Sequence, residues 1–98
     1  MNKTALLAAV LSMTTAAALA ATPATDAQKG QFYAECFKTS QNQPLCTCKA
    51  EAAMKLIDSD FMAVVIVAMH DGGKLDPKYN TAYIKYIAAS TKACGMGM

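Results

Sequence analysis

The stretch PLCTCKAEAAMKL, residues 44–56, decides the fold, because two cysteines lie one residue apart near the start of a helical pattern. Residues two apart on an α-helix point about 200° apart, since the helix has 3.6 residues per turn. Cys46 and Cys48 therefore face different neighbours. We predict that one of them pairs with the preceding segment and the other with the C-terminal segment.

The chain contains four cysteines, and the other two are Cys36 and Cys94. Four cysteines allow three pairings. A bond between Cys46 and Cys48 would close a strained ring and is the least favoured. Of the remaining two pairings we favour Cys36–Cys46 with Cys48–Cys94, because Cys48 lies on the same helical stripe as Leu56, which we expect to face inward. The reverse pairing stays open at this point.

Other uses of cysteine fit the spacing less well. The sequence has no second cysteine pair at zinc spacing, and its single histidine, His70, is not part of a zinc motif. The Cys-x-x-Cys spacing of redox motifs and the Cys-x-x-Cys-His spacing of haem attachment are also missing from the sequence. We therefore predict that the four cysteines form structural disulfides.

Residues 1–20, MNKTALLAAVLSMTTAAALA, have the layout of a secretory signal peptide. Lys3 makes the start positive, an apolar run follows, and Ala18 and Ala20 suit a cleavage site after Ala20. A membrane anchor is the alternative, but the strongly apolar part is shorter than the ~20 residues that span a bilayer. We expect export to the bacterial periplasm or the medium, where disulfides persist, and a single domain over residues 21–98.

Caps and helix breakers divide residues 21–98 into four helical segments. Thr25 or Asp26 can cap the first helix, the turn SQNQP at residues 40–44 follows it, and Pro77 suits the first turn of the last helix. The predicted helices run from about residue 26 to the turn and over 45–57, 61–70 and 77–94. We expect an all-α, four-helix domain stapled by two disulfides.

Side-chain directions follow from the same pattern. In the second helix we expect an inner stripe of Leu45, Cys48, Ala52 and Leu56, with Lys49 and the other charged residues facing solvent. The third helix contains FMAVVIVAM, residues 61–69, and is apolar nearly all round. Helices of that kind are buried on most sides.

Composition excludes several classes of function. Without Lys3 the chain has eight lysines against seven acidic residues, and it contains no arginine or tryptophan. Nucleic-acid binding is disfavoured, because it needs a basic surface and usually arginine. The aspartate pairs Asp58–Asp60 and Asp71–Asp76 lie where helix caps are needed, so we predict no enzymatic activity and no cofactor.

Two sets of residues could nevertheless form binding sites. Thioether and imidazole ligands suit Cu(I), which makes a metal site from Met69, His70, Met96 and Met98 an alternative, although methionine is a common core filler and His70 suits a helix C-terminus. The tyrosines of the last helix could form a partner surface, since tyrosine is frequent at interfaces, or the rim of a small core. They are Tyr79, Tyr83 and Tyr86.

The pattern Cys36-x9-Cys46-x-Cys48…Cys94 behind a signal peptide resembles small exported bacterial proteins of unknown function. This resemblance implies export and a helical fold, and it carries no activity. The chain is more distantly similar to small periplasmic acid-stress chaperones, which have more charge and two cysteines. Its Cys-x-Cys is also similar to that of plant lipid-transfer proteins, which have eight cysteines and pair these two in opposite directions.

The function expected from these features is binding in the cell envelope. We expect a non-enzymatic module whose ligand is a partner protein or a small apolar molecule. Copper handling through methionine and histidine is one alternative. An envelope stress chaperone that exposes apolar surface on acidification is the other.

Overall fold

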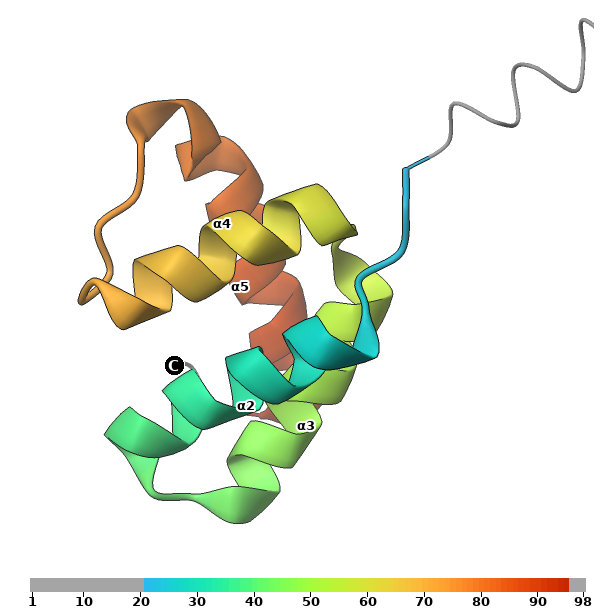
Figure 1. Ribbon diagram of the computed structural model, residues 1–98, viewed down its shortest axis with the longest axis vertical. Coiled ribbons are helices and arrows are strands. Elements are labelled where there is room, and N and C mark those ends of the chain that lie inside the picture. The colour runs from blue at the N-terminus through green and yellow to red at the C-terminus, as the bar shows by residue number, and fades with distance from the viewer. Residues whose placement is uncertain (1–20, 96–98) are drawn as a thin grey trace, which may run out of the picture.

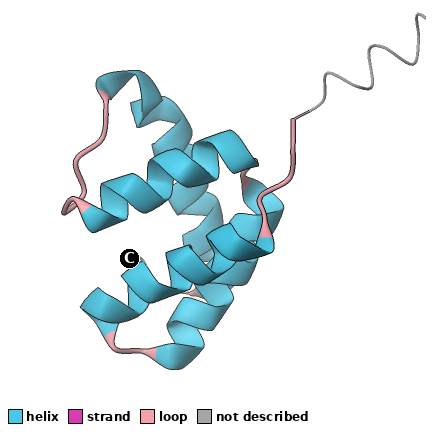
Figure 2. Ribbon diagram, viewed as in Figure 1, coloured by secondary structure: helices cyan, strands magenta, loops and turns pink. Residues whose placement is uncertain are grey.

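The computed structural model describes residues 21–95 and confirms the predicted all-α domain of four helices (Figures 1 and 2). A 3₁₀ turn, η1, leads into the last helix. The elements are α2 (Asp26–Ser40), α3 (Gln43–Leu56), α4 (Ser59–His70), η1 (Pro77–Tyr79) and α5 (Asn80–Cys94). The predicted signal peptide, Met96 and Met98 lie outside the described residues.

The α2–α3 hairpin forms the centre of the domain (Figure 1). Helix α4 packs against α2, and α5 packs against α3. The core lies where these helices meet, and its large members come mostly from α2 and α4, with α5 adding one tyrosine. They are Phe32, Met62, Val65 and Tyr86.

Side-chain caps set the starts of the first and third helices. Thr25 Oγ1 accepts a hydrogen bond from Gln28 N at 3.1 Å, and Gln28 Oε1 accepts one from Thr25 N at 3.0 Å. This capping box satisfies backbone donors that the helix leaves free. Asp58 Oδ1 accepts from Phe61 N at 2.8 Å. Because Asp58 supplies the cap, α4 begins at Ser59, two residues before the predicted start.

The loop between α2 and α3 is shorter than the predicted turn. Gln41 takes a left-handed conformation (φ 54°) after α2, and Asn42 Oδ1 caps α3 by accepting from Leu45 N at 3.0 Å. Pro44 lies in the first turn of α3, where its missing N–H leaves no helical bond unmade. The helix therefore begins at Gln43.

The segment before α2 is tied to the start of α4. Ser59 N donates to Thr22 O at 2.8 Å, and Ser59 Oγ donates to Gln28 Oε1 at 3.1 Å. Gln28 Nε2 donates to Ser59 O at 3.0 Å, and Ala24 is buried. These contacts fix the crossing of α2 and α4 at one end, which the sequence patterning did not reveal.

The predicted burial of α3 side chains is wrong at three positions. Lys49 is 0% exposed although it was expected in solvent, Leu56 is 43% exposed although it was expected inside, and Leu45 is only half-buried. The reason is that α3 lies between α2 and α5 and buries two faces. Small residues line those two faces, so the pattern of large apolar side chains did not identify the faces as buried. These small residues are Cys46, Ala50, Ala52 and Ala53.

Helix α4 is less buried than its composition predicts. Met62, Val65 and Ala68 are buried, but Ala63 is exposed and Val67 is 58% exposed. Among the described helices α4 packs mainly against α2. One apolar side of α4 is therefore left open to solvent.

Candidate functional site

The two disulfides follow the favoured pairing. Cys36 bonds to Cys46 with a Cα–Cα distance of 5.7 Å, and Cys48 bonds to Cys94 with a Cα–Cα distance of 5.8 Å. The first spans 10 residues of sequence and fastens the hairpin, whereas the second spans 46 residues and fastens α5 to α3. Cys46 and Cys48 point to different sides of α3 and therefore bond to different helices, as predicted. Of the two, Cys46 is the more buried, although Cys48 was expected to face inward.

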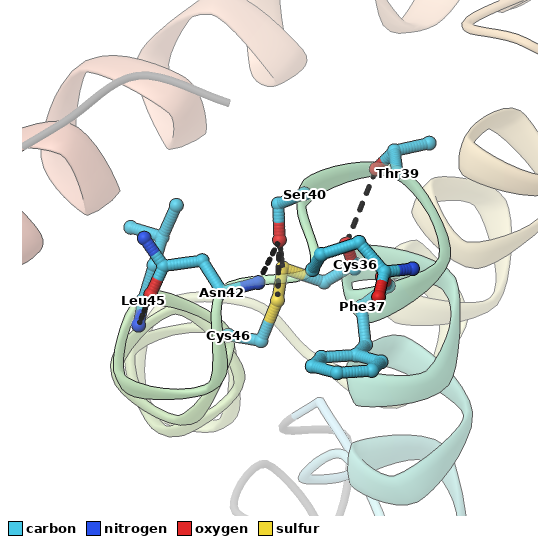
Figure 3. Close-up of a disulfide and its surroundings, with 8 residues drawn as sticks. Cys36, Phe37, Thr39, Ser40, Asn42, Leu45 and Cys46 are labelled. Atoms are coloured by element: carbon cyan, nitrogen blue, oxygen red, sulfur yellow. Dashed lines mark hydrogen bonds between the residues drawn. A yellow bond between two sulfur atoms is a disulfide. The ribbon is translucent and has the colours of Figure 1, made fainter.

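The Cys36–Cys46 bond is buried within the α2–α3 hairpin. Both residues are fully buried. Figure 3 shows the hydroxyl of Ser40 over the bond, with Ser40 Oγ 3.1 Å from Cys46 Sγ. Asn42 N donates to the same hydroxyl at 3.2 Å. Because the disulfide sulfur carries no hydrogen, the Ser40 hydroxyl donates to it.

A buried polar pair joins α3 to α5 next to the second disulfide. Lys49 Nζ donates to Ser90 Oγ at 3.3 Å, and Ser90 Oγ donates to Ile87 O at 3.2 Å. Both Lys49 and Ser90 are fully buried, and Lys49 forms no ion pair with any residue in 21–95. Burial lowers the pKa of the Lys49 amine, because a charged amine there has lost its water.

This pair was not found from the sequence. In the sequence Lys49 looked like an ordinary surface charge within an alanine-rich helix. Serine and lysine can act together in nucleophilic catalysis. In this chain both side chains are covered by protein, so their contact packs α5 onto α3.

The three tyrosines of the last segment lie at the edge of the core. Tyr86 is 5% exposed, and burial raises its pKa, with the charge of Tyr83 as a second cause. The rings of Tyr83 and Tyr86 lie 6.3 Å apart, and the Tyr79 ring lies 5.9 Å from that of Phe61 on α4. Burial removes Tyr86 from a partner surface, while Tyr79 and Tyr83 stay half-buried.

His70 bridges two helices through Glu35. His70 Nδ1 lies 3.0 Å from Glu35 Oε2, and Lys38 Nζ lies 3.2 Å from Glu35 Oε1. The hydrogen bond from His70, followed by the contact with Lys38, holds the pKa of Glu35 below its usual value of 4.5, although some burial opposes the shift. The neighbouring Met69 is half-buried against the core.

Only two members of the predicted copper set, Met69 and His70, lie within the described residues. Met96 and Met98 are outside the described residues, and His70 is engaged with Glu35. Residues 21–95 contain no group of three or more histidine, cysteine, aspartate or glutamate side chains that could hold a metal ion.

The Glu35 contact predicts an acid-sensitive link between α2 and α4. A carboxyl whose folded pKa is depressed stabilises the fold above its unfolded pKa, and this contribution is lost as pH falls through the folded value. We expect Glu35→Gln to have a lower Tm than the parent at pH 7, with the difference shrinking as pH falls below 4.5, the usual pKa of the carboxyl. Thermal unfolding followed by circular dichroism measures it. An undiminished difference at pH 3 would contradict the assignment.

Shallow hollows surround the exposed side of α4. One, of about 360 Å³, lies between α4 and the segment that leads to η1, and Val67 and Tyr79 are part of its wall. Another, of about 300 Å³, lies between α2 and α4, and Val67 is part of its wall too. A third, of about 410 Å³, is bounded by α3, α4 and α5, with Leu56, Phe61 and Tyr86 in its lining.

No family model, curated protein or solved structure matches this chain. Within residues 21–95, no helix combines the length and apolarity that a membrane span requires. The described residues have two distinctive features that bear on function: the open apolar side of α4 and the unequal burial of the two disulfides.

Proposed function

We propose that this protein is a non-enzymatic binding module of the cell envelope, and that α4 binds an amphipathic helix of a partner protein. The observation that carries the proposal is the exposure of Val67, 58% open in the most apolar helix of residues 21–95. We define the α4 surface as Ala63, Val64, Ile66 and Val67. Apolar surface kept open on a small domain is typical of an interaction site.

The shape of the α4 surface suits a helix. Val67 belongs to the walls of two hollows, so it forms a ridge between two depressions. Helices pack by placing the ridges of one into the grooves of the other. A partner helix would seat side chains in both hollows, one on each side of Val67.

Charges around the α4 surface restrict the partner. Lys74 and Asp76 line the first hollow, and Glu35 and His70 line the second. The first hollow therefore offers both signs of charge, and the second offers a carboxylate beside an imidazole. This arrangement complements a helix whose apolar stripe is flanked by mixed charges, and it gives a strongly charged polymer no continuous surface of opposite sign.

Export is the second part of the proposal, and it is supported by two independent features. Residues 1–20 have the signal-peptide layout, and all four cysteines are paired in disulfides. Disulfides persist in oxidising compartments and are rare in the cytosol. We therefore propose that the module acts in the periplasm or outside the cell.

A designed peptide tests the α4 surface. The probe is a synthetic helix of about 18 leucine, lysine and glutamate residues with one apolar stripe, and its partner control has the same composition in scrambled order. We expect Val67→Lys to weaken binding of the striped peptide by at least roughly tenfold in fluorescence anisotropy, because burying a valine contributes about 1.5–3 kcal/mol.

Ile84→Lys provides the matched control. Ile84 is 68% exposed on α5, so this variant adds the same charge at an apolar position away from α4, and its affinity is expected to equal that of the parent. Equal affinity of Val67→Lys and the parent, or equal binding of both peptides by the parent, would overturn the proposal. Self-association in sedimentation equilibrium that Val67→Lys abolishes would also overturn it, because the occupant would then be a second copy of this chain.

A small apolar ligand is the second candidate. The hollow between α3, α4 and α5, at about 410 Å³, falls within the range of ~300–1,000 Å³ found for small-molecule sites. Leu56, 43% exposed, lies at its edge. We favour the partner helix because the α4 surface has hollows on both sides of its ridge.

A further inference from the structure

The two disulfides differ in how far a reactant can approach them. Cys36 and Cys46 are fully buried and lie beneath the Ser40 hydroxyl. Cys48 and Cys94 are each partly open to solvent. Thiol–disulfide exchange requires a thiolate to reach a sulfur atom directly, so the native fold offers only the second bond for attack.

We propose that the Cys48–Cys94 bond is a thiol–disulfide exchange site that takes a protein dithiol as its co-reactant, and that its reduction releases α5 from α3. The Cys36–Cys46 bond would then be permanent and the Cys48–Cys94 bond exchangeable, whatever the α4 surface binds.

The hold on α5 depends on this bond. Among its side chains only Tyr86 and Ser90 are buried. The core cluster is built mostly by the other three helices, with residues such as Phe32, Met62 and Val65, and α5 adds one fully packed side chain to it, Tyr86. The segment that leads to α5 includes Gly72 and Gly73, both with positive φ, and packs loosely enough to leave a hollow against α4.

The exchange is a two-electron reaction. The first thiolate of the dithiol attacks Cys94 Sγ, forming a mixed disulfide while the Cys48–Cys94 bond breaks and Cys48 leaves as a thiolate that takes a proton from water. The second thiol of the reductant, after losing its proton, attacks the mixed disulfide and releases Cys94. The reductant ends as a disulfide, and this chain ends with two thiols. Both sulfurs are partly open, and attack at Cys94 is the less obstructed because Cys94 ends α5 and Gly95 follows it without a side chain.

Solvation of Lys49 favours opening of the reduced form. Its amine is fully buried and contacts Ser90 of α5, and a buried amine without an acidic partner is poorly solvated. When the covalent tie is cut, departure of α5 returns the amine to water. The newly exposed face of α3 would then present Lys49 beside small apolar residues.

Trapping of partial reduction tests the exchange site on the unmodified protein. The mature chain is incubated under native conditions with a limiting dithiol, either dithiothreitol or reduced thioredoxin, then quenched with iodoacetamide and mapped by mass spectrometry. We expect a form with two thiols, at Cys48 and Cys94, to accumulate at a rate at least roughly tenfold above that of reduction of Cys36 and Cys46. Concerted appearance of four thiols, or earlier reduction of Cys36 and Cys46, would overturn the proposal.

Release of α5 is tested on the trapped two-thiol form. Acylation by an N-hydroxysuccinimide ester is compared at Lys49 and at Lys55, which is exposed on the same helix. We expect labelling of Lys49 to rise at least roughly tenfold over the oxidised protein while that of Lys55 stays constant, since only Lys49 gains access to solvent. Unchanged labelling of Lys49 would show that α5 stays docked and would overturn the release.

Discussion

Replacing Cys48 and Cys94 together with alanine is expected to lower the free energy of unfolding by about 4 kcal/mol. The bond spans 46 residues, and in the chain-entropy model a closed loop of that length restricts the unfolded chain by about this amount. A domain of this size has a total stability of only ~5 kcal/mol or somewhat more. The loss of this bond therefore removes a large share of that stability, while the Cys36–Cys46 bond still closes the α2–α3 hairpin.

Urea unfolding followed by circular dichroism measures this loss. Thr47→Ala is the matched control, because Thr47 is exposed between the two cysteines of α3 and surface substitutions of this kind change stability by no more than ~0.5 kcal/mol. The parent kept oxidised gives the reference curve. A loss below about 1 kcal/mol for the double variant would show that residues 21–95 hold together without this bond and would contradict the prediction.

The positions of the helices and the opposite directions of Cys46 and Cys48 could be predicted because their signals are local, whereas which of the two pairs with Cys36 stayed open. Asp76 caps and Pro77 opens η1, with Asp76 Oδ1 accepting from Lys78 N at 3.1 Å, and Thr25 caps α2. The pairing of Cys46 and Cys48 in different directions follows from helical phase alone. Such features need a few neighbouring residues and no knowledge of what packs against them.

The buried faces of α3 and the exposed side of α4 could not be predicted, since they depend on where other helices dock. Lys49 is buried because α5 crosses α3 at Ser90, 41 residues further along the chain. Glu35 meets His70 across 35 residues of sequence. Val67 is exposed because α4 packs mainly against α2. In each case the local pattern fits several arrangements, and tertiary packing selects one.

Lys49→Met is expected to stabilise the protein at pH 7 by about 2 kcal/mol. Lys49 is fully buried. Replacing a buried ion pair by apolar side chains of similar volume is neutral or stabilising by ~1–4 kcal/mol, and a buried amine without an ionic partner has at least as much to gain. Methionine has a similar length and fills the same space. Ser90 keeps its hydrogen bond to Ile87 O, so the substitution leaves no hydroxyl hydrogen unpaired.

The pH dependence of this gain distinguishes a relieved charge from better packing. Burial places the folded pKa of Lys49 below its unfolded value of 10.5, so between the two values the unfolded state binds more protons and the parent gains stability as pH rises. The advantage of Lys49→Met should therefore shrink as pH approaches 10.5. Tyr86, whose raised pKa lowers stability above about pH 10, is present in both the parent and the variant. Lys55→Met, changed at an exposed position of α3, should show no gain at either pH. If the gain of Lys49→Met were the same at pH 7 and pH 10, better packing would explain it, and removal of a buried charge would not be its source.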